Sequence, residues 1–173
     1  MATHLTINQV FIVLLVCVLA GLGAPASAGT SLSKHGDWEA FTGRESGKLV
    51  CYMGAVPTKS RGKYTKRGQT FLLITHRPAE KSKNVISLQA GYTFEKTSEV
   101  ELAIGETSFK LFTDEQWAFA ADIATDNELV KSMIGGAALI VSGLSSRGTQ
   151  TTDTYSLKGF TAALKAIGKA CKI

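Results

Sequence analysis

The sequence predicts a mainly β protein, an antiparallel β-sandwich with one short interior helix and a C-terminal helix. Three observations support this fold class. Short segments with apolar or alternating side chains recur along the chain, turn residues separate them at short intervals, and two segments have helical periodicity. Repeated short strands joined by turns are typical of antiparallel sheets that pack on each other.

The first 28 residues have the pattern of a cleaved signal peptide. Residues 10–20 form an uninterrupted apolar run, and Ala26, Ser27 and Ala28 provide the small residues of a cleavage site. No Lys or Arg precedes the run, which departs from the usual pattern. The run is shorter than the about 20 apolar residues that span a bilayer. We therefore expect cleavage after Ala28 and one exported domain at residues 29–173, with an uncleaved membrane anchor as the alternative.

The first strands are predicted after a polar lead-in. Residues 29–35 are small and polar, so we expect them to be flexible and the first strand to open at Trp38. Residues 48–56 alternate with apolar side chains on both faces, which predicts a central strand. This strand would bury Cys51 on the face that carries Leu49 and Met53. Residues 57–68 are polar and predict a loop.

The middle of the chain contains most of the predicted strands. They lie at residues 70–75, 85–94, 99–104, 107–112 and 117–121. Gly105 and Glu106 separate two of these segments and predict a tight hairpin turn of type II′, which has Gly in its first central position. Gly91 is expected to mark a bulge.

One helix is predicted to interrupt the strands. Thr125 and Glu128 match a capping box, in which each side chain satisfies an exposed backbone N–H group, and Gly135 marks the end of the helix. Residues 137–144 and 149–155 then predict a hairpin. Its second, Thr-rich strand is expected at an exposed position or at a sheet edge.

The C-terminal helix carries its apolar side chains on one face. At about 100° per residue, one stripe holds Leu157, Phe160, Leu164, Ile167 and Cys171. Two cysteines remain after the expected cleavage, Cys51 and Cys171. Such a pair in an exported chain predicts one disulfide, here between the C-terminal helix and an early strand. Two buried thiols that never meet are the alternative.

The charge of the chain is mildly basic, with a formal net charge of +5. Residues 57–68 contain no acid and hold five cations: Lys59, Arg61, Lys63, Lys66 and Arg67. A solvated loop explains this composition, and a binding patch for an anionic surface is the functional alternative. Tyr64 is the only aromatic residue in this segment, which is too little for nucleic-acid recognition, so no nucleic-acid partner is expected.

The pattern of potential catalytic residues does not predict an enzyme. There is no nucleophile motif of the Gly-x-Ser-x-Gly type, no spaced set of metal ligands and no phosphate-binding loop, so no metal or cofactor is expected. His76, Arg77 and Arg147 are the residues that a ligand-binding or catalytic alternative would use. Arg147 lies in a predicted turn at residues 145–148 that could hold an anion. A strand-end histidine bonded to the backbone is the structural interpretation of His76.

Several motifs taken together resemble the invasion-associated locus B family of bacterial exported proteins. They are Gly36-Asp37-Trp38, Val50-Cys51-Tyr52, residues 71–78, 84–92 and 109–113, and the block at residues 145–160 with Ala170-Cys171 near the C-terminus. The resemblance covers residues 36–171. It implies an immunoglobulin-like β-sandwich in the periplasm or at the outer surface, without catalytic residues or a cofactor. For some members it also implies an association with entry into host cells.

The sequence thus predicts a non-catalytic protein of the cell envelope with an interaction or structural role. Its expected partner is an unidentified envelope or host protein, or an anionic surface, bound through exposed strands and the basic segment. A small periplasmic ligand-binding domain or enzyme is the alternative.

Overall fold

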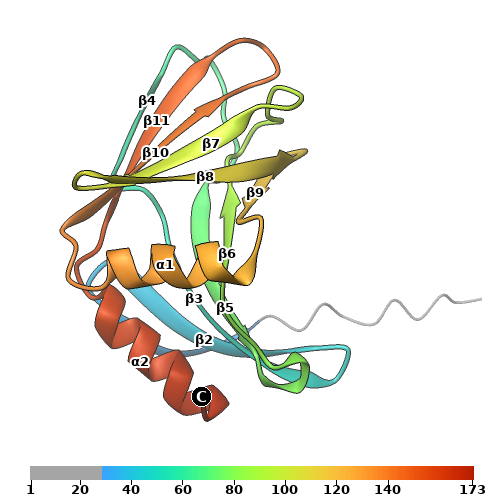
Figure 1. Ribbon diagram of the computed structural model, residues 1–173, viewed down its shortest axis with the longest axis vertical. Coiled ribbons are helices and arrows are strands. Elements are labelled where there is room, and N and C mark those ends of the chain that lie inside the picture. Colours follow the sequence, from blue (N-terminus) through green and yellow to red (C-terminus); the bar gives the residue numbers. More distant parts are fainter. Residues whose placement is uncertain (1–28) are drawn as a thin grey trace, which may run out of the picture.

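The computed structural model describes residues 29–173 as an antiparallel sheet with two helices (Figure 1). The predicted signal peptide and its cleavage site lie outside the described residues. In chain order the elements are β1 (Thr30–His35), β2 (Trp38–Glu45), β3 (Lys48–Ala55), β4 (Lys59–Gly62), β5 (Phe71–Arg77), the short 3₁₀ turn Pro78–Glu80, β6 (Ser82–Gln89), β7 (Glu99–Ile104), β8 (Thr107–Asp114), β9 (Trp117–Phe119), α1 (Ile123–Met133), β10 (Ala138–Leu144), β11 (Gln150–Ser156) and α2 (Phe160–Cys171).

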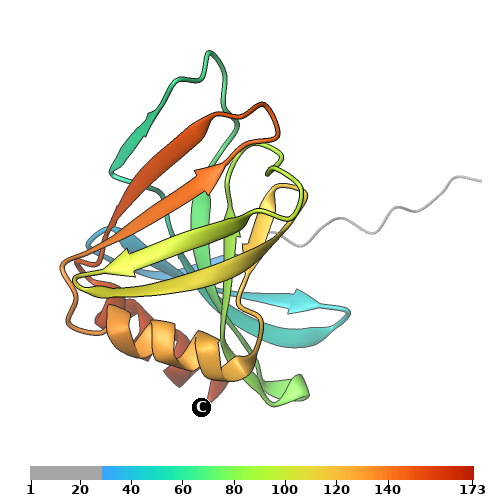
Figure 2. The same cartoon turned by 45° about the horizontal axis from the view of Figure 1, so that its top comes forward.

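The strands form one continuous sheet in the order β1-β2-β3-β5-β6-β9-β8-β7-β10-β11-β4, and every pairing is antiparallel. The sheet bends strongly, so its two halves enclose a single apolar core (Figures 1 and 2). The predicted mainly β antiparallel fold with one interior and one C-terminal helix is confirmed. The two layers of the predicted sandwich are the two halves of this continuous sheet.

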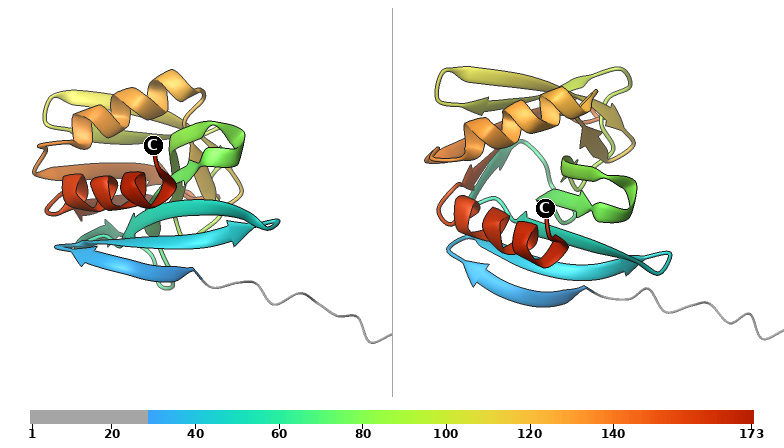
Figure 3. Two further views of the ribbon diagram at one scale, coloured as in Figure 1. Left: turned by 90° about the horizontal axis from the view of Figure 1, so that it is seen from below. Right: turned by 60° about the horizontal axis from the view of Figure 1, so that its bottom comes forward.

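The two helices lie at the same end of the molecule. Figure 3 shows α2 lying along β2 and β3, while α1 packs against β6. On the inner face of α2, Phe160 is fully buried and meets Trp38 edge to face, with ring centroids 5.0 Å apart. The indole N–H of Trp38 donates to the carbonyl oxygen of Ser156 at 2.9 Å. The predicted stripe is thus the inner face of α2, with Ile167 and Cys171 also buried.

The predicted flexible lead-in at residues 29–35 is instead strand β1. It pairs with β2 from Thr30 to His35 through a tight turn at Gly36, whose φ of +58° suits glycine. Small polar side chains do not prevent this pairing, because an edge strand is held by backbone hydrogen bonds on one side and its side chains remain mostly exposed.

The opposite edge of the sheet also differs from the prediction. Within the predicted loop at residues 57–68, β4 pairs with β11 and forms the final strand of the sheet. The Thr-rich strand β11 is therefore not an edge, and it buries Thr151, Asp153 and Tyr155. Its polar side chains tolerate burial because they meet polar partners, as described below.

One local prediction, the start of the interior helix, was also wrong. Helix α1 begins at Ile123, and its N-cap is Asp122, whose carboxylate accepts a 2.8 Å hydrogen bond from the backbone N–H of Thr125. Thr125 therefore lies in the first turn and is not the cap. Cys51 and Met53 are fully buried on one face of β3, as predicted, while Leu49 on the same face is 38% exposed next to the β2–β3 turn.

Candidate functional site

The predicted basic loop and the turn after β10 meet around a cavity of about 450 Å³. Its lining comes mainly from three segments, residues 63–68, 91–93 and 145–149. Backbone hydrogen bonds hold these segments together: the N–H of Gly68 donates to Gly91 at 2.8 Å, and that of Ser146 donates to Thr93 at 2.9 Å. Segments distant in sequence thus form one surface, which we call the basic cavity.

Arg67 forms the wall of the basic cavity and is almost completely buried, with 6% of its side chain exposed. Two guanidinium nitrogens donate to the two carboxylate oxygens of Asp153 at 2.8 and 2.6 Å, and Nε donates to the carbonyl oxygen of Ala90 at 2.7 Å. Such bidentate pairs are among the stronger hydrogen-bonded contacts in proteins. Burial disfavours the guanidinium charge, but Asp153 outweighs it and the pKa of Arg67 is raised. Arg67 is therefore a structural residue.

Two tyrosines pack against Arg67. The guanidinium carbon lies 5.0 Å from the ring centroid of Tyr92 and 5.6 Å from that of Tyr64, distances typical of cation–π contacts. The hydroxyl of Tyr92 bonds to that of Thr151 at 2.6 Å. Burial raises the pKa of Tyr92, so this hydroxyl stays neutral at physiological pH and acts as a hydrogen-bonding group.

The exposed charges around the basic cavity are all positive. Lys63, Lys66 and Arg147 line it, and in the described part of the chain none of its lining residues is Asp or Glu. Arg61 lines a neighbouring hollow of about 530 Å³, which shares Lys63 and Thr149 with the basic cavity. Of the five cations predicted for surface binding, Lys59, Arg61, Lys63 and Lys66 are exposed. Arg67 must be removed from this set, because its charge is buried against Asp153.

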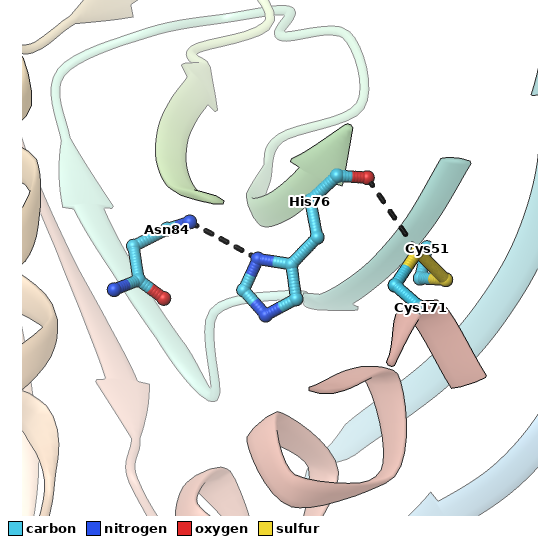
Figure 4. The surroundings of a disulfide bond; sticks show 4 residues. All are labelled: Cys51, His76, Asn84 and Cys171. Atoms are coloured by element: carbon cyan, nitrogen blue, oxygen red, sulfur yellow. Dashed lines mark hydrogen bonds between the residues drawn. A yellow bond between two sulfur atoms is a disulfide. The ribbon is translucent and has the colours of Figure 1, made fainter. Parts of the chain in front are cut away.

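His76 lies in the interior near the opposite end of β5. It is 4% exposed, and its Nδ1 accepts a 3.0 Å hydrogen bond from the backbone N–H of Asn84 (Figure 4). Burial is the main reason that the pKa of His76 is lowered, and the nearby Lys83 charge acts in the same direction. This geometry matches the structural interpretation of a strand-end histidine bonded to the backbone.

The disulfide between Cys51 and Cys171 lies beside His76 (Figure 4). The two Cα atoms are 5.9 Å apart, and both cysteines are buried. The predicted disulfide is confirmed. The Sγ atom of Cys171 is 3.9 Å from the carbonyl oxygen of His76, and since a disulfide sulfur has no proton to donate, we regard this as a packing contact.

The three residues of the predicted ligand-binding alternative do not converge. His76 faces the core, whereas Arg77 faces outward as the next residue of the same strand and binds Glu45 at 2.8 Å. Arg147 lines the basic cavity, and neither His76 nor Arg77 does. Within residues 29–173, no group of three or more His, Cys, Asp or Glu side chains is arranged to hold a metal ion.

An aromatic groove of about 530 Å³, not predicted from the sequence, lies on the outer face of the sheet. It is lined on one side by Tyr52 and on the other by Trp117 and Phe119, whose rings stack with centroids 6.3 Å apart. Leu73 forms part of its floor. The only signal for this groove is that strands such as β3 have apolar side chains on both faces.

Comparisons with known proteins match this chain to one family. The family model described as invasion associated locus B (IalB) protein matches residues 38–168. The crystal structure of invasion associated protein B from Bartonella henselae is similar with a TM-score of 0.59 at 16% sequence identity, covering 81% of this chain and 96% of that chain. This similarity supports the fold alone. No match was found among curated proteins.

Between residues 29 and 173, no helix is long and apolar enough to cross a membrane.

Proposed function

Because the chain belongs to the invasion associated locus B family, we propose that it is an exported, non-catalytic protein of the bacterial cell envelope that binds an anionic partner or surface. The family match supports the envelope setting, and the N-terminal apolar run supports export to the periplasm or the outer surface. The role is one of interaction or structure, and the partner class includes envelope and host-cell molecules.

The observation that carries this proposal is the arrangement of four exposed cations. Lys59 and Arg61 lie on the edge strand β4, and Lys63 and Lys66 follow in the adjoining loop. Among residues 29–173, no acidic residue lines either hollow beside them. Cations without intervening acids produce a local positive potential, which attracts anionic partners and is screened by salt.

Capture of envelope and host-cell components tests this proposal. The loop variant carries Lys59→Gln, Arg61→Gln, Lys63→Gln and Lys66→Gln, while the control variant carries Lys34→Gln, Lys83→Gln, Lys131→Gln and Lys165→Gln, all exposed cations outside the loop. The two variants lose the same charge. We expect chemical crosslinking, followed by mass spectrometry, to recover the partners with the wild type and the control and to lose them with the loop variant.

Salt dependence provides a second readout. Capture by the wild type should weaken between about 0.05 and 0.5 M NaCl, because salt shortens the range of charge interactions. Recovery of the same partners in the same yield from the loop variant would show that the loop is not the binding surface.

His76, Arg77 and Arg147 do not share a pocket, which argues against a ligand-binding or catalytic site that would use the three together.

A further inference from the structure

The basic cavity and the hollow next to it adjoin, and we call the two together the cationic channel. They share Lys63 and Thr149, so their volumes of about 450 and 530 Å³ adjoin. We define the cationic channel by its four exposed cations, Arg61, Lys63, Lys66 and Arg147. Cations at successive positions along two adjoining hollows suit a chain with repeated negative charges better than a single small anion.

The wall of the channel is fixed by hydrogen bonds within the protein. Arg67 is buried against Asp153 and Ala90, and its charge is therefore not available to a ligand. Its contacts fix the loop that presents Lys63 and Lys66. A loop already held in place loses little conformational freedom on binding, which favours affinity.

The uncharged lining of the channel mixes hydroxyl and amide groups with apolar surface, which includes the rings of Tyr64 and Tyr92. No Ala, Val, Leu, Ile, Met, Phe or Trp lines either hollow among the described residues. Among residues 29–173 no aliphatic side chain there provides a pocket for an apolar residue of a peptide, so a peptide ligand would depend on charge or on backbone pairing. Its lining instead offers hydroxyl and amide groups that donate and accept hydrogen bonds, from Thr65, Thr93, Ser146, Thr149, Gln150 and Thr152.

These features define the ligand by its chemistry. A polymer that combines repeated carboxylate groups with many hydroxyl groups matches both the cations and the polar lining. Tyr64 is 37% exposed at the channel and adds a ring surface on which a sugar can pack. We infer that the cationic channel binds an acidic polysaccharide. This inference rests on the proposed function and names the ligand class of the same surface.

The test uses polygalacturonate as the probe, with two matched polymers. Methyl-esterified polygalacturonate keeps the sugar backbone and loses the charges, while poly-L-glutamate keeps carboxylates on a peptide backbone. We expect the mature protein to bind polygalacturonate at low salt, to bind poly-L-glutamate at least tenfold more weakly at equal carboxylate concentration, and not to bind the ester. Isothermal titration calorimetry measures all three.

Arg147 provides the decisive substitution, because it lies on the turn opposite the basic loop and is exposed. We expect Arg147→Gln to weaken polygalacturonate binding about fivefold, the effect of losing one exposed ion pair. Lys131→Gln removes an exposed cation from α1 and should leave the affinity unchanged. Equal melting temperatures of the two variants would show that neither change disturbs the fold.

Three results would overturn the inference. The first is that the wild type does not bind polygalacturonate. The second is that it binds poly-L-glutamate as tightly as polygalacturonate or more tightly. The third is that Arg147→Gln leaves the affinity for polygalacturonate unchanged. Each leaves the proposed function standing if the four-residue loop variant still loses its captured partners. Conversely, unchanged capture by the loop variant contradicts the proposed function even if Arg147 contributes to polysaccharide binding.

Discussion

Arg67 and Asp153 form a salt bridge from which water is almost excluded, with 6% and 3% of their side chains exposed. Removing two charges from water is unfavourable, and their attraction offsets this only when the geometry is good and the remaining polar atoms are bonded. Here both carboxylate oxygens accept from Arg67, whose Nε also binds Ala90. The pair thus fixes the basic loop onto β11.

Breaking this pair from one side should destabilise the protein strongly. Arg67→Gln leaves the Asp153 carboxylate buried without its cation, and we expect the free energy of unfolding to fall by about 3–5 kcal/mol. Urea denaturation followed by circular dichroism measures it. Lys66→Gln, the exposed neighbour, is the control and should change stability by less than about 0.5 kcal/mol.

A second substitution shows whether the unpaired Asp153 carboxylate causes this loss of stability. Adding Asp153→Asn to Arg67→Gln removes the unpaired charge, so the double variant should be more stable than Arg67→Gln alone. If Arg67→Gln is as stable as the control, the buried ion pair does not hold the loop.

His76 should make stability depend on pH. Its pKa is lowered in the folded protein, chiefly by burial, whereas in the unfolded chain it is near the ordinary value of 6.5. Below that value the unfolded chain binds a proton that the folded protein does not. The stabilising contribution is therefore complete above about pH 6.5 and is lost progressively as the pH falls toward the lowered pKa of the folded state.

Urea denaturation at pH 7.5, 6.5 and 5.5 measures this effect. We expect the wild type to lose stability between pH 6.5 and 5.5, and His76→Gln to lose less over the same interval. His35→Gln is the matched control, since His35 lies at the end of the edge strand β1, and it should keep the wild-type slope. An unchanged slope in His76→Gln would show that another group causes the acid sensitivity.

At the level of elements, the N-terminal end of α1 illustrates how local signals compete. Asp122 and Thr125 are both good capping residues, and either could begin the helix. The earlier start allows Asp126 to point inward, where its carboxylate accepts a 2.9 Å hydrogen bond from the backbone N–H of Ile86 on β6. Packing against the sheet, more than capping preference, therefore decides where α1 begins.

Helix α2 is held by its apolar face and by one covalent bond. Phe160 and Ile167 are buried against the sheet, and the disulfide joins the last residue of α2 to the middle of β3. The two cysteines are 120 positions apart, so the bond closes a large loop in the unfolded chain and lowers the conformational entropy of that state. The loop-entropy relation gives a stabilisation of about 4–5 kcal/mol for a loop of this size.

Removal of the disulfide tests this contribution. We expect the double variant Cys51→Ala, Cys171→Ala to lose about 2–5 kcal/mol of unfolding free energy in urea denaturation. Reducing agent should destabilise the wild type and have no effect on the double variant, which serves as the control. Alkylation of both thiols in the folded protein without reductant, detected by intact mass, would contradict the disulfide itself.

At the scale of the whole molecule, structural and proposed binding features lie at opposite ends. Figure 1 shows both helices at one end of the long axis, and β4 with the β10–β11 hairpin at the other. The disulfide and His76 belong to the helical end, and the cationic channel to the far end. We infer that the helical end mainly stabilises the sheet while the opposite end is available to a partner.

The sequence by itself determined the local elements. Alternation identified β3, Gly105 identified the β7–β8 hairpin, and the helical stripe identified α2. These signals depend on residues that are close in sequence, and backbone geometry translates their spacing directly into a buried face. The cysteine pair was predicted for a different reason, because two thiols in an exported chain allow only one intramolecular bond.

Only the tertiary structure decided which polar residues act together. The partners Arg67 and Asp153 are 86 positions apart, and no local pattern distinguishes Arg67 from the exposed cations beside it. Edge strands β1 and β4 have little apolar patterning, because they depend on backbone pairing with strands that the chain order does not reveal. The sheet order sets which side chains become neighbours, and this determined that the basic loop and Arg147 line one cavity.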